Sequence, residues 1–398
     1  MKKILIIHSN MEIGGAEISL LGLLDSIDYN AYSVDLYLLE HKGEFLGMIP
    51  EQVTLLPEKI EYKALVTSVV SCLKKRQYGI ALIRTLCKLV FSIENRKNKY
   101  PDGGYVLKQY YHANALPLLP PIEGSYDMAI SFIDPHFVLS DKVNAGVKVG
   151  WFHTDFSRIV PNRKLEQKMW NGCDYAVNVS DQCKDVFDMA HPDMVNRSLM
   201  IENIKSARLI NGNASVFSAE PEIPSDGSIR LLSVGRFSEQ KNFDNVPDIC
   251  RRLREMGLNV KWYLIGFGGD EALIRQKIVE AGMQDFVIVL GKKENPYPYI
   301  AACDLYVQPS RYEGKCVAVI EAQILHKPVV ITDYATSGSQ LQDGYDGVIV
   351  PMDNAGCAEG IAGVLRDPQL QEQLIENTKQ QDYTNAAEIQ KLYQLIEG

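Results

Sequence analysis

Two α/β domains, each built around a parallel sheet that helices cover on both faces, are the fold class that this sequence predicts. Short runs rich in β-branched and aromatic residues alternate with helical stretches of about ten residues along almost the whole chain, which is the pattern of successive βαβ units. Runs such as 231–235 (LLSVG) show no alternation of polar and apolar residues, as expected for strands buried on both faces. The length of 398 residues suits two domains rather than one.

The first half of the chain contains seven candidate strands. They lie at 3–9, 33–39, 52–57, 127–133, 147–153, 174–180 and 199–203. The chain starts with a methionine and two lysines before an apolar run, which resembles a secretion signal, but that run is only about four residues long and polar residues follow at once. We therefore expect a strand there. No stretch of the chain approaches the roughly 18 apolar residues that would span a bilayer.

A polar segment rich in glycine, proline and serine, 211–228, separates the two halves. Six further candidate strands follow it, at 229–235, 260–266, 286–291, 304–309, 328–332 and 347–350. The chain closes with an amphipathic helical stretch at 386–398. We expect a first domain at 1–207, a second at 208–380 and a closing segment, 381–398, whose helix returns to the first domain.

Charge and metal-ligand composition narrow the classes of function. The chain has 50 acidic and 41 basic residues, a net charge of −9, which argues against a nucleic-acid binder. Its eight cysteines include no C-x-x-C pair, and its seven histidines show no metal-ligand spacing. We therefore expect reduced thiols, a cytoplasmic location and no bound metal or other cofactor. The absence of a D-x-D motif supports the expectation about metal.

One segment, 73–99, departs from the acidic average. It contains one acidic residue, Glu94, and eight basic ones, which are Lys74, Lys75, Arg76, Arg84, Lys88, Arg96, Lys97 and Lys99. Apolar residues from Leu73 to Phe91 recur among them at helical spacing. Such a helix either lies on the anionic inner face of a cell membrane or is a solvated helix whose apolar stripe packs on its own domain. The sequence leaves both interpretations open.

The second half carries the pattern G-R-x-x-x-x-K at its first strand. Gly235 closes the strand, so Arg236 and Lys241 emerge at the carboxyl edge of the sheet, where ligands of such sheets bind. An arginine fork suits phosphate oxygens, and a lysine adds a point charge on a flexible stem. We interpret the pair as a diphosphate site; the alternative is two solvated surface cations.

Two glutamates separated by seven residues follow the fourth strand of this half. Glu313 lies in the loop after that strand, and Glu321 lies about one turn into a helix that we expect to begin near Val317 and to end at Pro328. Between them, 314–316 would present free backbone N–H groups at the helix N-terminus, a natural seat for phosphate. A glutamate amid apolar residues, as Glu321 is, needs a partner, which favours a binding role over a surface one.

This arrangement resembles the donor site of retaining family-4 glycosyltransferases of the GT-B fold, in which two Rossmann-like domains with parallel sheets face each other across a cleft. The resemblance extends to the glycine loop at 10–20, the histidine segment at 151–155, the strand and turn at 262–271 and the run at 291–314, and so covers nearly the whole chain. It implies transfer of a hexosyl group from a nucleotide diphosphate sugar, with a UDP-sugar favoured, to a glycan or lipid-linked glycan acceptor in bacterial polysaccharide biosynthesis. The first domain would bind the acceptor and the second the nucleotide sugar.

The resemblance also implies a role for each matching residue. Arg236 and Lys241 would bind the diphosphate, Glu321 the ribose, and Glu313 the transferred sugar, to which His153 would hydrogen-bond. Main-chain contacts are implied for Gly14 and Gly15 beside phosphate or acceptor, for Leu290, Gly291 and Lys292 around the base, and for Gly314, Lys315, Cys316 and Val317 around the sugar and its phosphate. Lys315 and Cys316 replace a hydrophobic and a small residue that are common in the family, which leaves the sugar open.

Three other functions compete with this one. A dehydrogenase would need G-x-G-x-x-G after a strand, and both 13–18 (IGGAEI) and 266–271 (GFGGDE) lack it. A sugar-nucleotide epimerase or a phosphorylase of the same fold shares the architecture but should lack this spacing of the two glutamates. A non-catalytic member would bind a nucleotide sugar, or only a partner, and transfer nothing.

Overall fold

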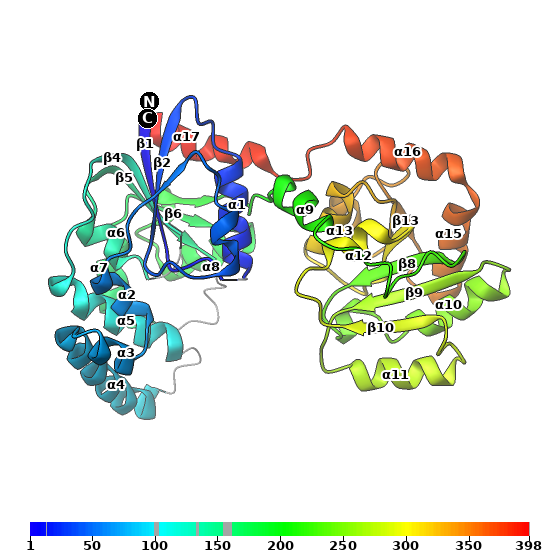
Figure 1. Ribbon diagram of the computed structural model, residues 1–398, viewed down its shortest axis with the longest axis horizontal. Coiled ribbons are helices and arrows are strands. Elements are labelled where there is room, and N and C mark those ends of the chain that lie inside the picture. The colour runs from blue at the N-terminus through cyan, green and yellow to red at the C-terminus, as the bar shows by residue number, and fades with distance from the viewer. Residues whose placement is uncertain (13, 99–102, 133–134, 154–160, 398) are drawn as a thin grey trace. The chain divides into compact units, whose positions relative to one another are not determined.

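The computed structural model describes residues 1–12, 14–98, 103–132, 135–153 and 161–397. The chain divides into two compact units (Figure 1). Unit 1 consists of 1–206 together with 385–398, and unit 2 of 207–384. The sequence predicts boundaries after residue 207 and after residue 380.

Unit 1 is built around a seven-stranded sheet in which every neighbouring pair of strands is parallel. Its strands are β1 (Lys2–His8), β2 (Tyr32–Leu38), β3 (Val53–Leu55), β4 (Tyr126–Ser131), β5 (Ala145–Phe152), β6 (Tyr175–Asn178) and β7 (Ser198–Met200). Their order is β3-β2-β1-β4-β5-β6-β7. From β1 the chain runs outward through β2 to β3, and it then returns to β4, which lies on the other side of β1. The carboxyl ends of β1 and β4 therefore form the switch point, where sheets of this kind bind ligands.

The strands of unit 1 are connected by helices that bury them. These helices are α1 (Gly15–Asp25), α2 (Ile60–Val66), α3 (Val69–Lys74), α4 (Tyr78–Asn98), α5 (Gly103–Ala115), α6 (Phe137–Lys142), α7 (Arg163–Trp170) and α8 (Asp181–Ala190). The five consecutive residues from Ile4 to His8 are all buried, although successive side chains of a strand point to opposite faces. Both faces of the strand are thus covered, which confirms the interpretation of the apolar runs.

The last helix of the chain, α17 (Ile389–Glu397), belongs to unit 1. The ring of Tyr393 stacks on that of Tyr32, with 4.3 Å between ring centroids, and its hydroxyl accepts the N–H of Asp28 at 2.9 Å. The ammonium of Lys2 donates to the carbonyl of Ile396 at 2.7 Å. These contacts hold α17 against the beginning of β1 and β2.

Unit 2 is built around a six-stranded parallel sheet with the order β10-β9-β8-β11-β12-β13. Its strands are β8 (Ile229–Val234), β9 (Val260–Ile265), β10 (Val287–Gly291), β11 (Leu305–Gln308), β12 (Val329–Thr332) and β13 (Val348–Val350). Its helices are α9 (Ala207–Ala214), α10 (Val246–Glu255), α11 (Glu271–Glu280), α12 (Tyr297–Ala302), α13 (Val317–Ile324), α14 (Ser337–Gln340), α15 (Asn354–Arg366) and α16 (Pro368–Lys379). The switch point lies between β8 and β11, which are the two strands that precede the cation motif and the glutamate motif.

The predicted fold class is confirmed, since each predicted strand is present with ends that differ by at most three residues, residue 133 lying outside the described ranges. Two helix predictions are wrong. The basic stretch is two helices, α3 and α4, because Arg76 takes a left-handed conformation with φ of 60°. The helix that begins at Val317 ends at Ile324, before Pro328, because His326 turns left-handed at φ 53°, and its amide bonds the carbonyl of Gln323 at 2.9 Å.

Candidate functional site

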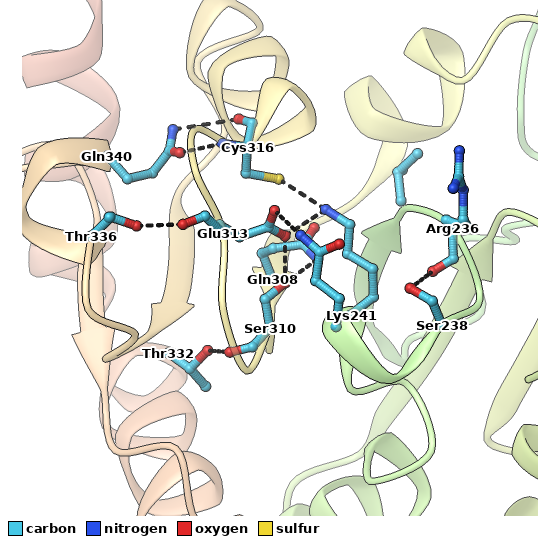
Figure 2. Close-up of polar contacts among 12 residues, drawn as sticks. Arg236, Ser238, Lys241, Gln308, Ser310, Glu313, Cys316, Thr332, Thr336 and Gln340 are labelled. Carbon is cyan, nitrogen blue, oxygen red and sulfur yellow. Dashed lines mark hydrogen bonds and ion pairs between the residues drawn. The ribbon is translucent and has the colours of Figure 1, made fainter. Parts of the chain in front are cut away.

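The site is centred on the contact between Lys241 and Glu313. Lys241 ends the short 3-10 helix η5 (Glu239–Lys241) after β8, and its ammonium lies 2.5 Å from the Glu313 carboxylate and 3.6 Å from the sulfur of Cys316 (Figure 2). The side chains are only 14% and 5% exposed. A Cβ atom at Gly235 would stand 3.1 Å from the lysine stem, so the glycine at the strand end leaves room for the lysine to reach the glutamate.

Polar neighbours hold the Glu313 carboxylate in place. It accepts hydrogen bonds from the hydroxyl of Ser310 at 2.7 Å and from Lys241 (Figure 2). It also accepts one from the side-chain amide of Gln240 at 2.9 Å. The carbonyl of Glu313 accepts the hydroxyl of Thr336 at 2.7 Å. Three donors on the carboxylate and one on the backbone preorganise the loop after β11, which reduces the reorganisation needed when a ligand binds.

The N-terminus of α13 departs from the prediction at Cys316. The N–H of Cys316, expected to be free, donates to the side-chain carbonyl of Gln340 at 2.6 Å (Figure 2). The amide nitrogen of Gln340 in turn donates to the carbonyl of Cys316 at 3.4 Å. Because Gln340 comes from α14, a separate part of the chain, nothing in the local pattern around Gly314 indicates this contact. The backbone at Cys316 is therefore pinned and is not a free donor for phosphate.

Arg236 lies at the same end of the sheet with its guanidinium apart from the Lys241–Glu313 contact (Figure 2). Within the described ranges its side chain makes no ion pair or hydrogen bond; its carbonyl accepts the hydroxyl of Ser238 at 3.5 Å. Arg236, Lys241 and Tyr312 are among the residues that border a hollow of about 500 Å³. One exposed arginine, unpaired in the part of the chain that the structure describes, and one paired lysine thus border a space large enough for a diphosphate.

Glu321 lies on α13, about one turn from the start of that helix. Its carboxylate accepts the hydroxyl of Tyr297 at 3.0 Å, and burial, followed by the nearby charge of Glu321, raises the pKa of that phenol. The buried Tyr306, whose phenol also has a raised pKa through burial, stands within electrostatic reach of both Cys316 and Glu321. Glu321 is therefore held by Tyr297, a tyrosine that the sequence analysis did not single out.

The segment 290–292 is connected to the loop that carries Arg236 and Lys241 through the glycine turn that follows β9. Gly291, at the end of β10 with φ of 72°, accepts through its carbonyl the N–H of Gly266 at 3.0 Å. The amide of Phe237 in turn bonds the carbonyl of Phe267 at 2.9 Å. The ammonium of Lys292 lies over the ring of Phe267, 5.5 Å from its centroid. The loops after β8, β9 and β10 are thus stacked side by side.

Gly14, Gly15 and His153 lie in unit 1. Gly14 precedes α1 with an extended φ of −164°, and the place of a Cβ atom there is occupied by the carboxylate of Glu17; Gly15 has no atom within 4 Å of that place. The neighbouring Ile13, like Thr154 and Asp155 beyond the histidine, lies outside the described residues.

His153 follows β5 and packs its ring 4.6 Å from Phe132. Its Nε2 is buried and has no hydrogen-bond partner in the described part of the chain. Burial is the main reason that the pKa of His153 falls to about 3, and the neighbouring His8 and His136 lower it further. The ring is therefore neutral near pH 7, which suits a hydrogen bond to a hydroxyl and does not suit a cationic role.

Comparison with known proteins gives the following likenesses. The family model of glycosyl transferases group 1 matches residues 218–381. The lipopolysaccharide core biosynthesis glycosyltransferase LpsE of Rhizobium meliloti is 28% identical over 165 residues, 41% of this chain and 46% of that protein. A Campylobacter jejuni enzyme, N-acetylgalactosamine-N,N'-diacetylbacillosaminyl-diphospho-undecaprenol 4-alpha-N-acetylgalactosaminyltransferase, is 30% identical over 142 residues, 35% of this chain and 38% of that protein. The chain thus spans less than half the length of these curated relatives.

A likeness in structure covers both chains completely. HepE of Anabaena, solved in complex with UDP, superposes with a TM-score of 0.56 and 16% sequence identity, over 100% of this chain and 100% of that one. At this identity the likeness establishes the fold, which is the predicted GT-B class, and no more.

Proposed function

We propose that the chain transfers a hexosyl group from a nucleotide diphosphate sugar to a glycan or lipid-linked glycan acceptor in polysaccharide biosynthesis, starting from the match of residues 218–381 to the family model of glycosyl transferases group 1. The observation that carries the proposal is the contact between Lys241 and Glu313 at the switch point of unit 2, where Lys241 borders the same hollow as Arg236, which is unpaired within the described residues. Names of relatives that act in lipopolysaccharide core biosynthesis and on a diphospho-undecaprenol acceptor support it.

The proposed mechanism needs two kinds of stabilisation. As the anomeric carbon leaves the β-phosphate oxygen, negative charge grows on the diphosphate, and Arg236, Lys241 and the N-terminus of α13 stabilise it electrostatically. Glu313 binds hydroxyls of the sugar. The acceptor oxygen forms the new bond on the face that the phosphate leaves, and its proton passes to the departing phosphate oxygen, so the anomeric configuration is retained.

The Lys241–Glu313 contact has a consequence for ligand binding. The ammonium has three donors, so it can keep the carboxylate and still reach a phosphate oxygen. The pair thereby fixes the lysine before the donor arrives, which lowers the entropic cost of binding. When the nucleotide sugar binds, its diphosphate and the Glu313 carboxylate both lie close to the single ammonium of Lys241. Arg236, unpaired within the described residues, supplies the second positive charge that the diphosphate requires.

Nucleotide binding is the first test of the proposal. We expect UDP at 100 times its dissociation constant to stabilise the folded chain by about 2.7 kcal/mol, measured as a rise in melting temperature across a panel of UDP, GDP, ADP and their sugars. UDP is favoured because HepE, of the same fold, was solved with it. A chain that no nucleotide stabilises would contradict the proposal. Stabilisation without turnover in the presence of acceptors would identify a non-catalytic binder. Turnover of the nucleotide sugar in the absence of an acceptor would identify an epimerase.

We also propose that α3 and α4 rest on an anionic membrane surface. On α4, Leu82, Leu86, Leu89 and Ile93 form a stripe at i, i+4, i+7 and i+11, with Leu82 61% and Ile93 62% exposed. Exposed cations lie on α3, on the turn between α3 and α4, and on α4; they are Lys74, Lys75, Arg76, Lys88 and Arg96. Arg84 is a correction to the predicted basic set, because it is buried, and Lys99 and the side chain of Lys97 lie outside the described part. No helix of the described residues has the length and hydropathy to cross a bilayer.

Vesicle binding tests this surface. Each lysine near an anionic surface contributes about 1 kcal/mol, so Lys74→Gln with Lys75→Gln should weaken binding to phosphatidylglycerol vesicles by about 30-fold, measured by cosedimentation at low salt. The matched control is Lys277→Gln with Arg275→Gln, two exposed cations on α11 of unit 2, which should leave vesicle binding unchanged. Equal binding of wild type to phosphatidylcholine vesicles would overturn the electrostatic part of this proposal.

A further inference from the structure

Unit 1 contains a hollow of about 410 Å³ that the sequence analysis did not find. It lies at the switch point of the seven-stranded sheet, where His8 ends β1 and Ser131 ends β4. The remaining wall comes from α2, α4, α5 and α6, and from segments that follow β1, β2 and β4. Its volume is in the range of small-molecule sites.

Four buried polar atoms around this hollow have no hydrogen-bond partner among the described residues. They are Nδ1 of His8, Nε of Arg84, the hydroxyl of Tyr111 and Nδ1 of His112, on residues that are 0%, 8%, 5% and 7% exposed. The large majority of buried polar side-chain atoms in proteins have a hydrogen-bond partner, and each one left unsatisfied costs about 1–3 kcal/mol. Four such atoms on residues that border one hollow therefore indicate that a polar ligand completes them.

Arg84 shows what charge that ligand carries. Its Nη1 donates to the carbonyls of Ala64 at 2.6 Å and Leu65 at 2.5 Å, at the end of α2. The guanidinium carbon lies 4.6 Å from the centroid of the Tyr111 ring. No carboxylate pairs with Arg84 in the described part of the chain, and a buried cation without an anion is costly. Two carbonyls and a ring face offset part of that cost and leave Nε unsatisfied.

The other residues that border the hollow also favour a negatively charged ligand. Lys108 on α5 is exposed and adds a second cation, and none of the described residues that border the hollow is acidic. Glu17, the carboxylate nearest to His8, is already engaged by Nε2 of that histidine at 2.9 Å. Burial lowers the pKa of His112 to about 3, so its ring is neutral. Water could satisfy the neutral atoms but would not neutralise the charge of Arg84.

We infer that this hollow receives an oxyanion, a phosphate or carboxylate carried on a sugar, with Arg84 and Lys108 binding the charged group and His8, Tyr111 and His112 binding hydroxyls. That this sugar is the acceptor rests on the proposed function; the binding itself does not. The chemistry is shared by a sugar phosphate and a uronic acid, and by a lipid-linked sugar whose phosphate is the charged group.

Calorimetry on the full-length chain tests the inference. The probes are glucose 6-phosphate, glucuronate and neutral glucose, each titrated into wild type and variants. We expect the two charged sugars to bind at least tenfold more tightly than glucose. Arg84→Gln should weaken their binding at least tenfold and leave that of glucose within threefold, and Arg84→Lys should restore part of the loss. Which charged sugar binds more tightly identifies the source of the oxyanion.

Two controls locate the binding and protect the test. Lys108→Gln, at an exposed position that does not threaten folding, should weaken binding of the charged sugars about threefold. Arg236→Ala, in unit 2, should leave their binding unchanged while it weakens UDP binding. Should Arg84→Gln fail to fold, by its melting curve, Lys108→Gln carries the test. Charged and neutral sugars bound equally, no binding at all, or a loss caused by Arg236→Ala alone would each overturn the inference. Failure of UDP to bind would instead count against the proposed function.

Discussion

Lys241→Ala should lower kcat/KM for glycosyl transfer at least about a hundredfold, the effect expected when one preorganised group that stabilises an oxyanion is removed. The loss has two sources. The diphosphate loses a cation, and the Glu313 carboxylate, only 5% exposed, loses the ammonium 2.5 Å away. Glu313→Ala should act on the sugar and Arg236→Ala on the diphosphate, each with at least a tenfold loss of turnover, roughly 1.4 kcal/mol of transition-state stabilisation.

The matched control for this prediction is Lys261→Ala. Lys261 also pairs with a carboxylate, that of Asp226, but it lies at the amino-terminal end of β9, the opposite edge of the sheet from the site. Its removal should leave kcat/KM unchanged, because a surface pair contributes little and touches no ligand. Wild-type kcat/KM in the Lys241, Glu313 and Arg236 variants alike would show that catalysis does not depend on this site.

Gly266→Ala should destabilise unit 2 by about 3 kcal/mol and abolish nucleotide binding. Gly266 has φ of 152°, a conformation that alanine rarely adopts, and a Cβ atom there would lie 1.8 Å from the carbonyl oxygen of Gly235. Relief of that clash would displace the loop that carries Arg236. For a unit of this size we expect the melting temperature to fall by roughly 6 °C or more, measured by scanning calorimetry with and without UDP.

Gly269→Ala supplies the comparison in the same turn. Among the described residues, no atom lies within 4 Å of a Cβ atom placed at Gly269, and its φ is not left-handed, so the variant should have the melting temperature of wild type and bind UDP normally. If the two alanine variants have the same melting temperature and bind UDP equally tightly, the close packing of the turns after β8 and β9 is not what positions Arg236.

The sequence by itself determined the two sheets and the elements that carry the site. Strand order along the chain and the apolar runs are local properties, and each strand of unit 2 was located within a few residues. A parallel βαβ arrangement then places the ends of β8 and β11 at one edge of the sheet. The motifs around Arg236 and Glu313 therefore had to lie near each other, although 72 residues separate Lys241 from Glu313.

Only the tertiary structure decided which polar groups are paired and which are left open. Gln340 reaches the amide of Cys316 from another helix, and Arg84 turns inward while Lys88, one turn later on α4, stays exposed. The physical reason is that burial and hydrogen bonding of a side chain depend on what packs against it, and that neighbour comes from a distant part of the chain. The periodicity of the sequence predicts that α4 is amphipathic. Which of its sides is buried depends on the packing of α2 and α5 against it.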